Sequence, residues 1–257
     1  MAWNTLLEAW RRGETTVGMW CSIGNPFAAE LVASTGVDYA CADVQHGAVD
    51  FHDLVPMLQA IERHRVAAVV RVPWCEPWQI MRALDAGATG VIVPLVNTRE
   101  DAALAAASFR YPPQGSRSYG PTRAGVSTGT LAPEELQDVA CILQIETATA
   151  VENLEEIASV DGVDALYIGP ADLALSMGFP PRSDEAIAPV EAAIERVREV
   201  CVERGIVPAM HCLSADQAAA RIDQGFQMVT IGIDAMHLRQ SVAAALTHVR
   251  PPTTEPH

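Results

Sequence analysis

Short apolar runs alternate with amphipathic segments along most of the chain. The runs predict strands, each followed by a helix, and strands that are apolar throughout indicate a parallel sheet buried on both faces. Eight such units in 257 residues favour one domain, a closed α/β (β/α)8 TIM barrel, over an open doubly wound sheet. The predicted strands cover 15–23, 38–43, 66–72, 90–95, 140–146, 165–169, 206–210 and 228–232, and the predicted helices 26–35, 52–63, 77–86, 98–108, 148–159, 188–204, 214–224 and 234–249.

The segment 110–139 interrupts this alternation because it is rich in Gly, Pro, Ser and Arg. A connection of this length in a compact domain is typically a functional loop. We therefore expect an active-site loop region, to which Arg117 or Tyr119 contributes. The alternative is an excursion without a function. Pro251 and Pro252 end the last helix and predict a flexible tail at 251–257.

The formal net charge is -15, which disfavours binding to nucleic acid or to an anionic membrane. No apolar run approaches the roughly 20 residues that span a bilayer, and the first 16 residues lack the core of a signal peptide. We expect a cytoplasmic protein. The cysteines form no CxxC pair, which indicates buried free thiols in a reducing compartment: Cys21, Cys41, Cys75, Cys141, Cys201 and Cys212.

The chain contains no lysine, so all 17 basic residues are arginine. A Schiff-base lysine is therefore excluded, with or without pyridoxal phosphate. Carbonyl chemistry in this chain needs another electron sink, and a divalent metal ion is the usual substitute.

Polar residues gather where the predicted strands end, and the carboxyl ends of the strands are where TIM barrels carry their active sites. Asp43 and His46 stop the apolar run of the second strand, and Gly47 lets the chain turn away. The other candidates are Arg71 after the third strand, Asp85 on the following helix, Gln144 and Glu146 on the fifth strand, Asp172 after the sixth, His211 after the seventh and Asp234 after the eighth.

Glu146 and Asp172 lie 26 positions apart, about one βα unit, so their carboxylates come from neighbouring strand ends. Two carboxylates with open positions are what Mg²⁺ or Mn²⁺ accepts, with water or substrate oxygens as the remaining ligands. On spacing alone, the same acids can instead cap helices or pair with arginine.

His46 is a candidate general base because imidazole titrates near neutrality, although it can also simply hydrogen-bond a loop. Arg71 lies in an apolar strand and must be paired or face an anion. A structural ion pair with Asp43 or Asp85 is the alternative. Free backbone N–H groups in the segment 168–172 can bind a carboxylate.

Taken together, these residues resemble the HpcH/HpaI aldolase family, the metal-dependent class II pyruvate aldolases, over roughly residues 5–245. The resemblance rests on five stretches in order: "GMWCSIGNPFAAELVASTGVDYACADVQHG", "VVRVPW…DAGATGVIVPLVNT", "YPPQGSRSYGP", "QIET" and "YIGPADLALSMG". It implies a TIM barrel that is usually a homohexamer, with the C-terminal helix exchanged between neighbouring subunits.

The resemblance also implies roles for single residues. Glu146 and Asp172 match the metal ligands. His46 matches the catalytic base, and Asp85 the acid that pairs with it and fixes its tautomer. Further matches are Arg71 with an arginine at the keto oxygen, Gln144 with a residue near the metal, and Gly169, Pro170 and Ala171 with the backbone segment that holds the pyruvate carboxylate.

The expected reaction is the reversible cleavage of a 4-hydroxy-2-oxo acid to an aldehyde and pyruvate, or a pyruvate-like 2-oxo acid, through an enolate stabilised by a divalent ion, Mg²⁺ or Mn²⁺, with Co²⁺ or Zn²⁺ as alternatives. One departure from the family pattern is Gln45, which stands where many members have Glu. The lost negative charge near the metal affects the choice of metal or substrate more than the reaction.

Three other functions remain open at this point. One is an acyl-CoA lyase of the malyl-CoA or citramalyl-CoA type, although such relatives tend to be longer and a CoA site favours a basic rim. The second is a phosphate-binding isomerase, for which the chain lacks a Gly-rich phosphate loop after the last two strands. The third is a non-catalytic barrel used for assembly or binding, which the full set of site residues disfavours.

Overall fold

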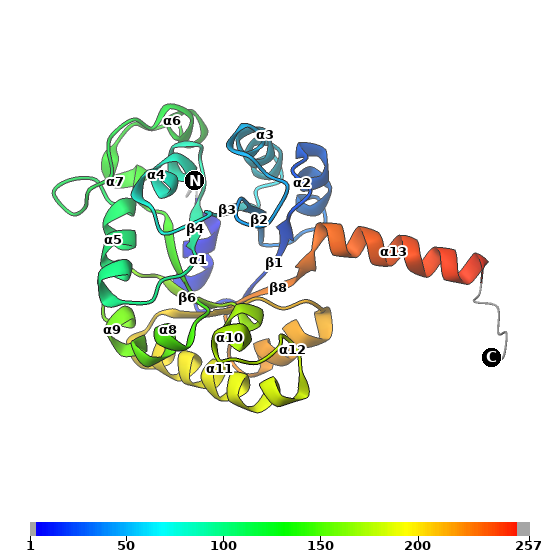
Figure 1. Cartoon of the computed structure of the whole chain (residues 1–257). Helices are drawn as coiled ribbons and strands as arrows, with labels where there is room; N and C mark the ends of the chain where they lie inside the picture. The colour runs from blue at the N-terminus through cyan, green and yellow to red at the C-terminus, as the bar shows by residue number, and fades with distance from the viewer. Residues whose placement is uncertain (1–3, 251–257) are drawn as a thin grey trace, which may run out of the picture.

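Eight parallel strands pair in chain order and close into a barrel, because β8 pairs with β1. The computed structural model describes residues 4–250 (Figure 1). The predicted TIM barrel and all its strands are confirmed, with ends that shift by one to two residues. The strands are β1 (Thr16–Cys21), β2 (Tyr39–Asp43), β3 (Ala67–Arg71), β4 (Gly90–Val93), β5 (Ala140–Ile145), β6 (Ala165–Ile168), β7 (Val207–Met210) and β8 (Met228–Ile233).

The predicted helices are present as well, with two differences. The segment 148–159 is divided at Asn153, which ends one short helix and begins the next. The helix predicted at 188–204 begins earlier, at Asp184. The helices are α2 (Pro26–Ala33), α3 (Phe51–Glu62), α4 (Pro77–Asp85), α5 (Arg99–Phe109), α8 (Ala148–Glu152), α9 (Leu154–Ala158), α11 (Asp184–Arg204), α12 (Ala215–Asp223) and α13 (Asp234–Val249).

Side chains along each strand alternate between two buried layers, as the pleat requires. In β2, Tyr39 and Cys41 belong to a cluster inside the barrel, whereas Ala40 and Ala42 belong to the layer between strands and helices. In β5, the inward residues are Ala140 and Ile142, and the outward ones are Cys141, Leu143 and Ile145. The same alternation places the next inward residue of each strand at its carboxyl end, where the polar residues lie.

The amino end of the barrel is closed by α1 (Thr5–Arg11), a helix that the sequence patterns did not predict. Leu6, Leu7 and Trp10 pack into the cluster inside the barrel. The Asn4 side chain accepts a hydrogen bond from the Leu7 N–H at 3.2 Å and donates to the backbone oxygen of Thr89 at 2.8 Å. Burial of these apolar side chains anchors the helix more strongly than its seven residues could alone.

The long segment 110–139 follows α5 and leads into the amino end of β5, so it lies at the amino end of the barrel. It contains two short helices, α6 (Thr122–Thr128) and α7 (Pro133–Leu136). Arg123 anchors it to the helix layer by hydrogen bonds to Glu62 Oε1 at 2.8 Å and to the backbone oxygen of Ala86 at 2.6 Å. Within one chain this segment therefore lies opposite the end where active sites form, and its role as an active-site loop stays a prediction.

The last helix, α13, leaves the barrel instead of packing on it (Figure 1). Its apolar side chains Leu238, Val242 and Leu246 are more than half exposed. The structure describes one chain and so does not test the predicted exchange of this helix. None of the helices in the described part of the chain combines the length and the apolar character that crossing a bilayer requires. The predicted flexible tail at 251–257 lies outside the described residues.

Candidate active site

Polar side chains continue the inward-facing rows of β2, β3 and β5 at the carboxyl end of the barrel. The pairing register sets Asp43 of β2 opposite Arg71 of β3. Gln144 of β5 is opposite Tyr167 of β6, and Glu146 follows on the same face two residues later. A cavity of about 410 Å³ opens here, and it is lined by His46, Arg71, Gln144, Asp172 and the segment 169–171, among others. The structure thus gathers all but two of the predicted site residues around one cavity, with Glu146 just behind Gln144 and Asp85 elsewhere.

Arg71 is held by a two-pronged ion pair with Asp43. Its Nε donates to Asp43 Oδ1 at 2.8 Å and its Nη2 donates to Asp43 Oδ2 at 2.7 Å, and both side chains are nearly completely buried. The guanidinium carbon also lies 4.1 Å from the centroid of the Trp20 ring. Two parallel hydrogen bonds fix the plane of the guanidinium, and no hydrogen-bond acceptor for Nη1 is found among residues 4–250. Arg71 therefore forms a structural ion pair with Asp43, which the sequence had left open as an alternative to an anion-binding role. Its side chain also lines the cavity.

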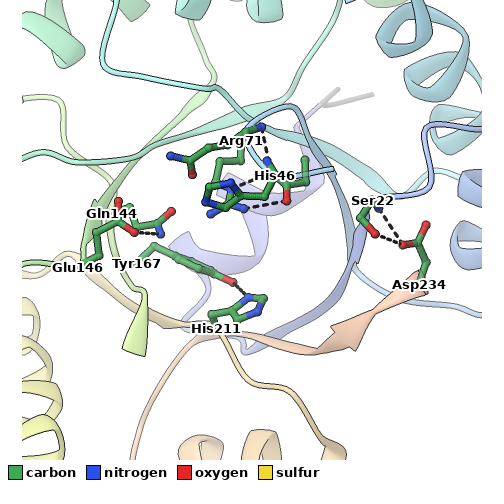
Figure 2. Close-up of polar contacts among 10 residues, drawn as sticks. Ser22, His46, Arg71, Gln144, Glu146, Tyr167, His211 and Asp234 are labelled. Atoms are coloured by element: carbon green, nitrogen blue, oxygen red, sulfur yellow. Dashed lines mark hydrogen bonds and ion pairs between the residues drawn. The ribbon is translucent and has the colours of Figure 1, made fainter. Parts of the chain in front are cut away.

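The same carboxylate shapes the turn that carries His46. Asp43 Oδ1 accepts the backbone N–H of Gln45 at 3.1 Å and that of His46 at 3.2 Å. The Gly47 N–H donates to the backbone oxygen of Asp43 at 3.1 Å, and a Cβ on Gly47 would lie 2.4 Å from that oxygen. Gly47 is therefore needed for close approach. Asp43, which the sequence analysis gave no catalytic role, therefore fixes the position of both His46 and Arg71, two residues that lie close together in Figure 2.

Glu146 lies behind the cavity with its carboxylate firmly oriented. Its Oε1 accepts the Leu95 N–H at 2.8 Å. Its Oε2 accepts a hydrogen bond from Gln144 Nε2 at 2.5 Å (Figure 2). Burial raises the pKa of Glu146, and the charge of Asp172 raises that pKa further. The hydrogen bond from Leu95 opposes this effect. The charge of Asp172, which follows β6, therefore acts on the Glu146 carboxylate, which follows β5.

The sixth strand leads into the short helix α10 (Pro170–Ser176), which begins in the segment 168–172 whose backbone N–H groups the sequence analysis singled out. A Cβ on Gly169 would lie 2.8 Å from Gln144 Nε2 and 3.1 Å from Glu146 Oε2, so only glycine lets these chains approach. The Gly169 N–H donates to the backbone oxygen of Ile145 at 3.2 Å, and Pro170 has no N–H. Ala171, in the first turn of α10, keeps an N–H without an acceptor in its own helix.

The donors at this corner suit a hard divalent cation. Glu146 and Asp172 supply carboxylate oxygens, and Gln144 Oε1 is a buried amide oxygen without a hydrogen-bond partner among the described residues. Oxygen-only donor sets select Mg²⁺ or Mn²⁺ over softer metals. No group of three or more His, Cys, Asp or Glu side chains within residues 4–250 is arranged to bind an ion. A metal held by the two acids would thus take its remaining ligands from Gln144, water or substrate.

On the other side of the cavity lies His211, to which the sequence assigned no role. Its Nδ1 is 3.2 Å from the hydroxyl of the fully buried Tyr167 (Figure 2), and the Trp20 ring packs edge-on at 4.6 Å between ring centroids. Burial, reinforced by the positive charges of Arg71 and Arg182, lowers the pKa of His211 to about 4. His211 is therefore neutral at physiological pH and presents an uncharged imidazole to the cavity.

Asp234, which follows β8, is hydrogen-bonded to the loop that follows β1 at the rim of the cavity. Its Oδ1 accepts both the N–H and the hydroxyl of Ser22 at 2.8 Å, and its Oδ2 accepts the Ile23 N–H at 3.3 Å (Figure 2). The Ser22 backbone oxygen accepts the Ala48 N–H at 2.8 Å, just beyond the turn that carries His46. Asp234, at the carboxyl end of β8, therefore orders the loop against which the His46 turn packs.

Asp85 does not join this site within the chain. It is the last residue of α4, at the amino end of the barrel, and its Oδ1 accepts the Arg117 Nη2 at 2.8 Å. Burial raises the pKa of Asp85, although Arg117 opposes this. The predicted pairing with His46 is not found here, because α4 runs from the carboxyl end of β3 toward the opposite end of the barrel. Arg117 is buried beside Asp85 and does not line the cavity.

The chain is similar to known proteins over most of its length. Residues 16–241 match the model of the family described as HpcH/HpaI aldolase/citrate lyase. The chain belongs to this family. It is 36% identical over 248 residues, 96% of this chain and 99% of the relative, to a hydroxypyruvate/pyruvate aldolase of Rhizorhabdus wittichii. It is 35% identical over 262 residues, 98% of this chain and 97% of the relative, to a 4-hydroxy-2-oxo-heptane-1,7-dioate aldolase of Klebsiella pneumoniae.

A solved structure of a family member from Burkholderia cenocepacia is similar over 96% of this chain and 99% of its own, with a TM-score of 0.89 and 34% identity. The sequence resemblance to this family is thereby confirmed. With two aldolases among its near-full-length relatives, the chain is an aldolase, a carbon–carbon lyase.

Proposed function

We propose that this aldolase reversibly cleaves a 4-hydroxy-2-oxo acid to an aldehyde and pyruvate, or a pyruvate-like 2-oxo acid, with a divalent metal ion at Glu146 and Asp172. One observation carries the proposal: Asp172 and the buried, oriented Arg71 line one cavity, and the Glu146 carboxylate lies just behind Gln144, which lines the same cavity. The names of the two aldolase relatives, one acting on pyruvate and one on a 4-hydroxy-2-oxo dicarboxylate, support the substrate class.

A bound divalent ion would supply Lewis-acid polarisation of the keto oxygen and positive charge for the enolate. Mg²⁺ or Mn²⁺ suits the oxygen donors best, and Co²⁺ or Zn²⁺ are weaker candidates. The missing lysine supports this class of mechanism, because a chain without lysine cannot form a Schiff base. Gln144 lies beside Glu146 and orients its carboxylate.

The oxo-acid half of the substrate fits between Arg71 and the start of α10. Its carboxylate faces the backbone of Gly169, Pro170 and Ala171, where the Ala171 N–H is the free donor. The Arg71 guanidinium, held in plane by Asp43, donates to the keto oxygen and gains strength as that oxygen becomes negative. Since the ion pair with Asp43 fixes the guanidinium in advance, little reorganisation is required during the reaction.

His46 acts as the base in the cleavage direction. It takes the proton of the 4-hydroxyl, the C3–C4 bond breaks, its electron pair forms the enolate, and the aldehyde leaves. Protonation of the enolate at C3 yields the 2-oxo acid, and the reverse sequence forms the new bond. The Asp43 carboxylate holds the His46 backbone at the rim of the cavity, which supports this role.

Removal of divalent ions tests the proposal directly. Protein treated with a chelator is expected to lose oxo-acid cleavage, measured as pyruvate release, and to regain it with Mg²⁺ or Mn²⁺. Glu146→Gln is expected to prevent this rescue, and to abolish the rise in melting temperature that the metal causes. Glu152→Gln, an exposed acid on α8, is the matched control and should behave as wild type. Full activity of metal-free protein would refute the mechanism.

The proposal includes an oligomer, a hexamer, in which α13 packs on a neighbouring copy of the chain. Support comes from two unpartnered apolar surfaces. One is the stripe Leu238, Val242 and Leu246 on α13, and the other is Phe27 and Leu31 on α2, beside the side of the barrel that α13 leaves uncovered (Figure 1). Light scattering should give a mass well above one chain, and deletion of 235–257 should reduce it. A monomeric full-length protein would contradict this part.

A further inference from the structure

One wall of the catalytic cavity has no part in the mechanism described so far. The oxo-acid half of the substrate is proposed to lie between Arg71 and the start of α10, so the aldehyde half extends toward the remaining wall. This wall presents His211 among apolar side chains. The apolar residues are Trp20, Leu213, Ile233, Ala235 and Met236.

Two other polar residues line the same wall, but neither offers an oriented donor. The Ser22 hydroxyl donates to Asp234 Oδ1 at 2.8 Å and is therefore engaged. Arg182 is exposed, so solvent hydrates its charge. His211 is thus the polar group on this wall whose direction the structure fixes.

Two buried aromatic side chains hold the imidazole of His211. The hydroxyl of Tyr167 lies 3.2 Å from His211 Nδ1, and the Tyr167 side chain is completely buried. The ring of Trp20, which is also buried, packs edge-on against the imidazole at 4.6 Å between centroids. These contacts set the plane of the imidazole before a substrate enters, which is the condition for an effective catalytic hydrogen bond.

The hydrogen bond with Tyr167 also decides which ring nitrogen of His211 carries the proton. Burial raises the pKa of Tyr167, so its hydroxyl stays protonated, and a buried hydroxyl normally donates to an acceptor. The neighbouring Thr230 hydroxyl already accepts the Cys212 N–H at 2.7 Å and donates to the Cys212 backbone oxygen at 2.8 Å. Tyr167 therefore donates to His211 Nδ1, and the proton of the neutral imidazole is on Nε2.

The Nε2–H group of His211 is available to a molecule in the cavity. Nδ1 is turned to the Tyr167 hydroxyl (Figure 2), and Nε2 has no hydrogen-bond partner among residues 4–250. Burial, reinforced by the charge of Arg71, lowers the pKa of His211 to about 4, so the imidazole keeps this single proton near neutral pH. A neutral N–H polarises a carbonyl oxygen without adding a second full charge beside Arg71.

We propose that His211 is a further catalytic residue, which donates a hydrogen bond from Nε2–H to the aldehyde oxygen of the substrate. This oxygen is the 4-hydroxyl oxygen of the oxo acid, from which His46 removes the proton. When the C3–C4 bond breaks, its electron pair passes to the enolate and the bond between C4 and this oxygen becomes a carbonyl. The proton of His211 stays on Nε2 throughout. This inference rests on the proposed function, because it assigns a role in the same reaction.

Two reactions separate this role from any effect on the oxo-acid half. Cleavage of 4-hydroxy-2-oxopentanoate, measured as pyruvate release, involves the aldehyde oxygen. Exchange of the methyl hydrogens of pyruvate with deuterium from D₂O, followed by proton NMR, passes through the same enolate without an aldehyde. His211→Leu should lower kcat for cleavage about tenfold to a hundredfold, the usual worth of a hydrogen bond to a charged group. It should leave the exchange rate within about twofold.

Three further variants distinguish a donor from a structural residue. His211→Gln should recover part of the lost kcat, because its amide N–H can replace the Nε2–H but cannot take up a proton. Tyr167→Phe removes the hydroxyl that fixes the tautomer and should lower kcat severalfold while the exchange rate is kept. The exposed His52 supplies the matched control, and His52→Asn should equal wild type in both reactions.

Nitrogen NMR of ¹⁵N-labelled wild type gives a readout that does not depend on activity. At pH 7 the signals of His211 should show a neutral imidazole with its proton on Nε2. A proton on Nδ1, or a charged ring, would overturn the assignment.

The outcomes separate this inference from the proposed function. If wild type with added metal carries out both reactions but His211→Leu alters both equally or neither, the role of His211 is wrong and the aldolase proposal stands. A loss in His211→Gln as large as that in His211→Leu would also refute the donor role. If wild type with added metal neither cleaves the oxo acid nor exchanges pyruvate, the proposed function itself fails.

Discussion

The two ends of the barrel are built from the same eight strands and differ sharply in what they contain. At the amino end, Leu6, Leu7 and Trp10 of α1 fill the opening with apolar side chains. At the carboxyl end, the inward rows finish in polar residues such as Arg71 and Gln144 around an open cavity. One end therefore contributes mainly to stability, and the other end carries the chemistry.

Ion pairs exist at both ends, but their surroundings differ. Asp85 and Arg117 pair at the amino end, under a segment that packs against the helix layer. Asp43 and Arg71 pair at the carboxyl end, where the arginine also lines the cavity and the acid holds the turn with His46. The comparison teaches that a buried ion pair is not by itself the sign of a site. The second pair differs because Arg71 lines the open cavity and its Nη1 is not used in the ion pair with Asp43.

The largest expected effect is a loss of turnover when the histidine at the carboxyl end, His46, is replaced, whereas replacing a histidine at the amino end should have no such effect. His46→Ala should lower kcat for oxo-acid cleavage by about 10²–10⁴-fold, the usual contribution of a positioned base, and should leave metal binding intact. His64→Ala, just after α3 at the amino end, should leave kcat unchanged. Steady-state kinetics with saturating metal measure both. Equal losses in the two variants would remove the functional contrast between the ends.

An intermediate effect is expected at Trp10, on stability alone. Its ring packs into the cluster inside the barrel, and its Nε1 donates to Thr16 Oγ1 at 3.0 Å. Trp10→Ala should lower the free energy of unfolding by about 3–5 kcal/mol, the usual loss for a large buried aromatic. Chemical denaturation measures this loss. At a temperature where the variant is folded, KM and kcat should equal those of wild type, and a selective rise in KM would contradict the division of roles.

The smallest expected effect concerns the neutral histidine of the cavity. The pKa of His211 falls from 6.5 to about 4 on folding, so between these values the unfolded chain binds the proton more strongly. Its contribution to stability is complete above pH 6.5 and is lost as pH falls to 4. The melting temperature of wild type should therefore fall between pH 7 and pH 4.5 by roughly 3–10 °C more than that of His211→Asn.

The exposed His52 gives the control for this measurement, because His52→Asn should keep the pH dependence of wild type. If His211→Asn loses as much stability as wild type on acidification, the imidazole is not held neutral. The catalytic cavity, which already contains Arg71, would then carry a further positive charge at mildly acidic pH.

Much of the fold could be predicted because its signal is local. A strand that is buried on both faces appears in the sequence as an apolar run, whichever strands it pairs with. Eight such runs, each followed by a predicted helix, were enough to predict the barrel. The missed elements, α1, α6 and α7, are short, and α1 and α6 are held by contacts with the distant residues Thr89 and Glu62. No periodicity marks helices of this length.

The site was predicted in part for a similar reason. Strand ends in a parallel barrel converge, so Arg71, Gln144 and Asp172 could be grouped from chain order. Asp85 ends a helix and the segment 110–139 follows one, and each of them precedes a strand. Such connections lie at the amino end of a barrel, away from the active site.

The sequence by itself determined the eight-unit barrel, the inward direction of the strand-end residues, the absence of lysine chemistry and the resemblance to an aldolase family. Only the tertiary structure decided that Arg71 pairs with Asp43 and not with Asp85, and that His211 is neutral. The physical reason is range: backbone periodicity acts between neighbours along the chain, whereas pairing and desolvation depend on which distant residues meet in space.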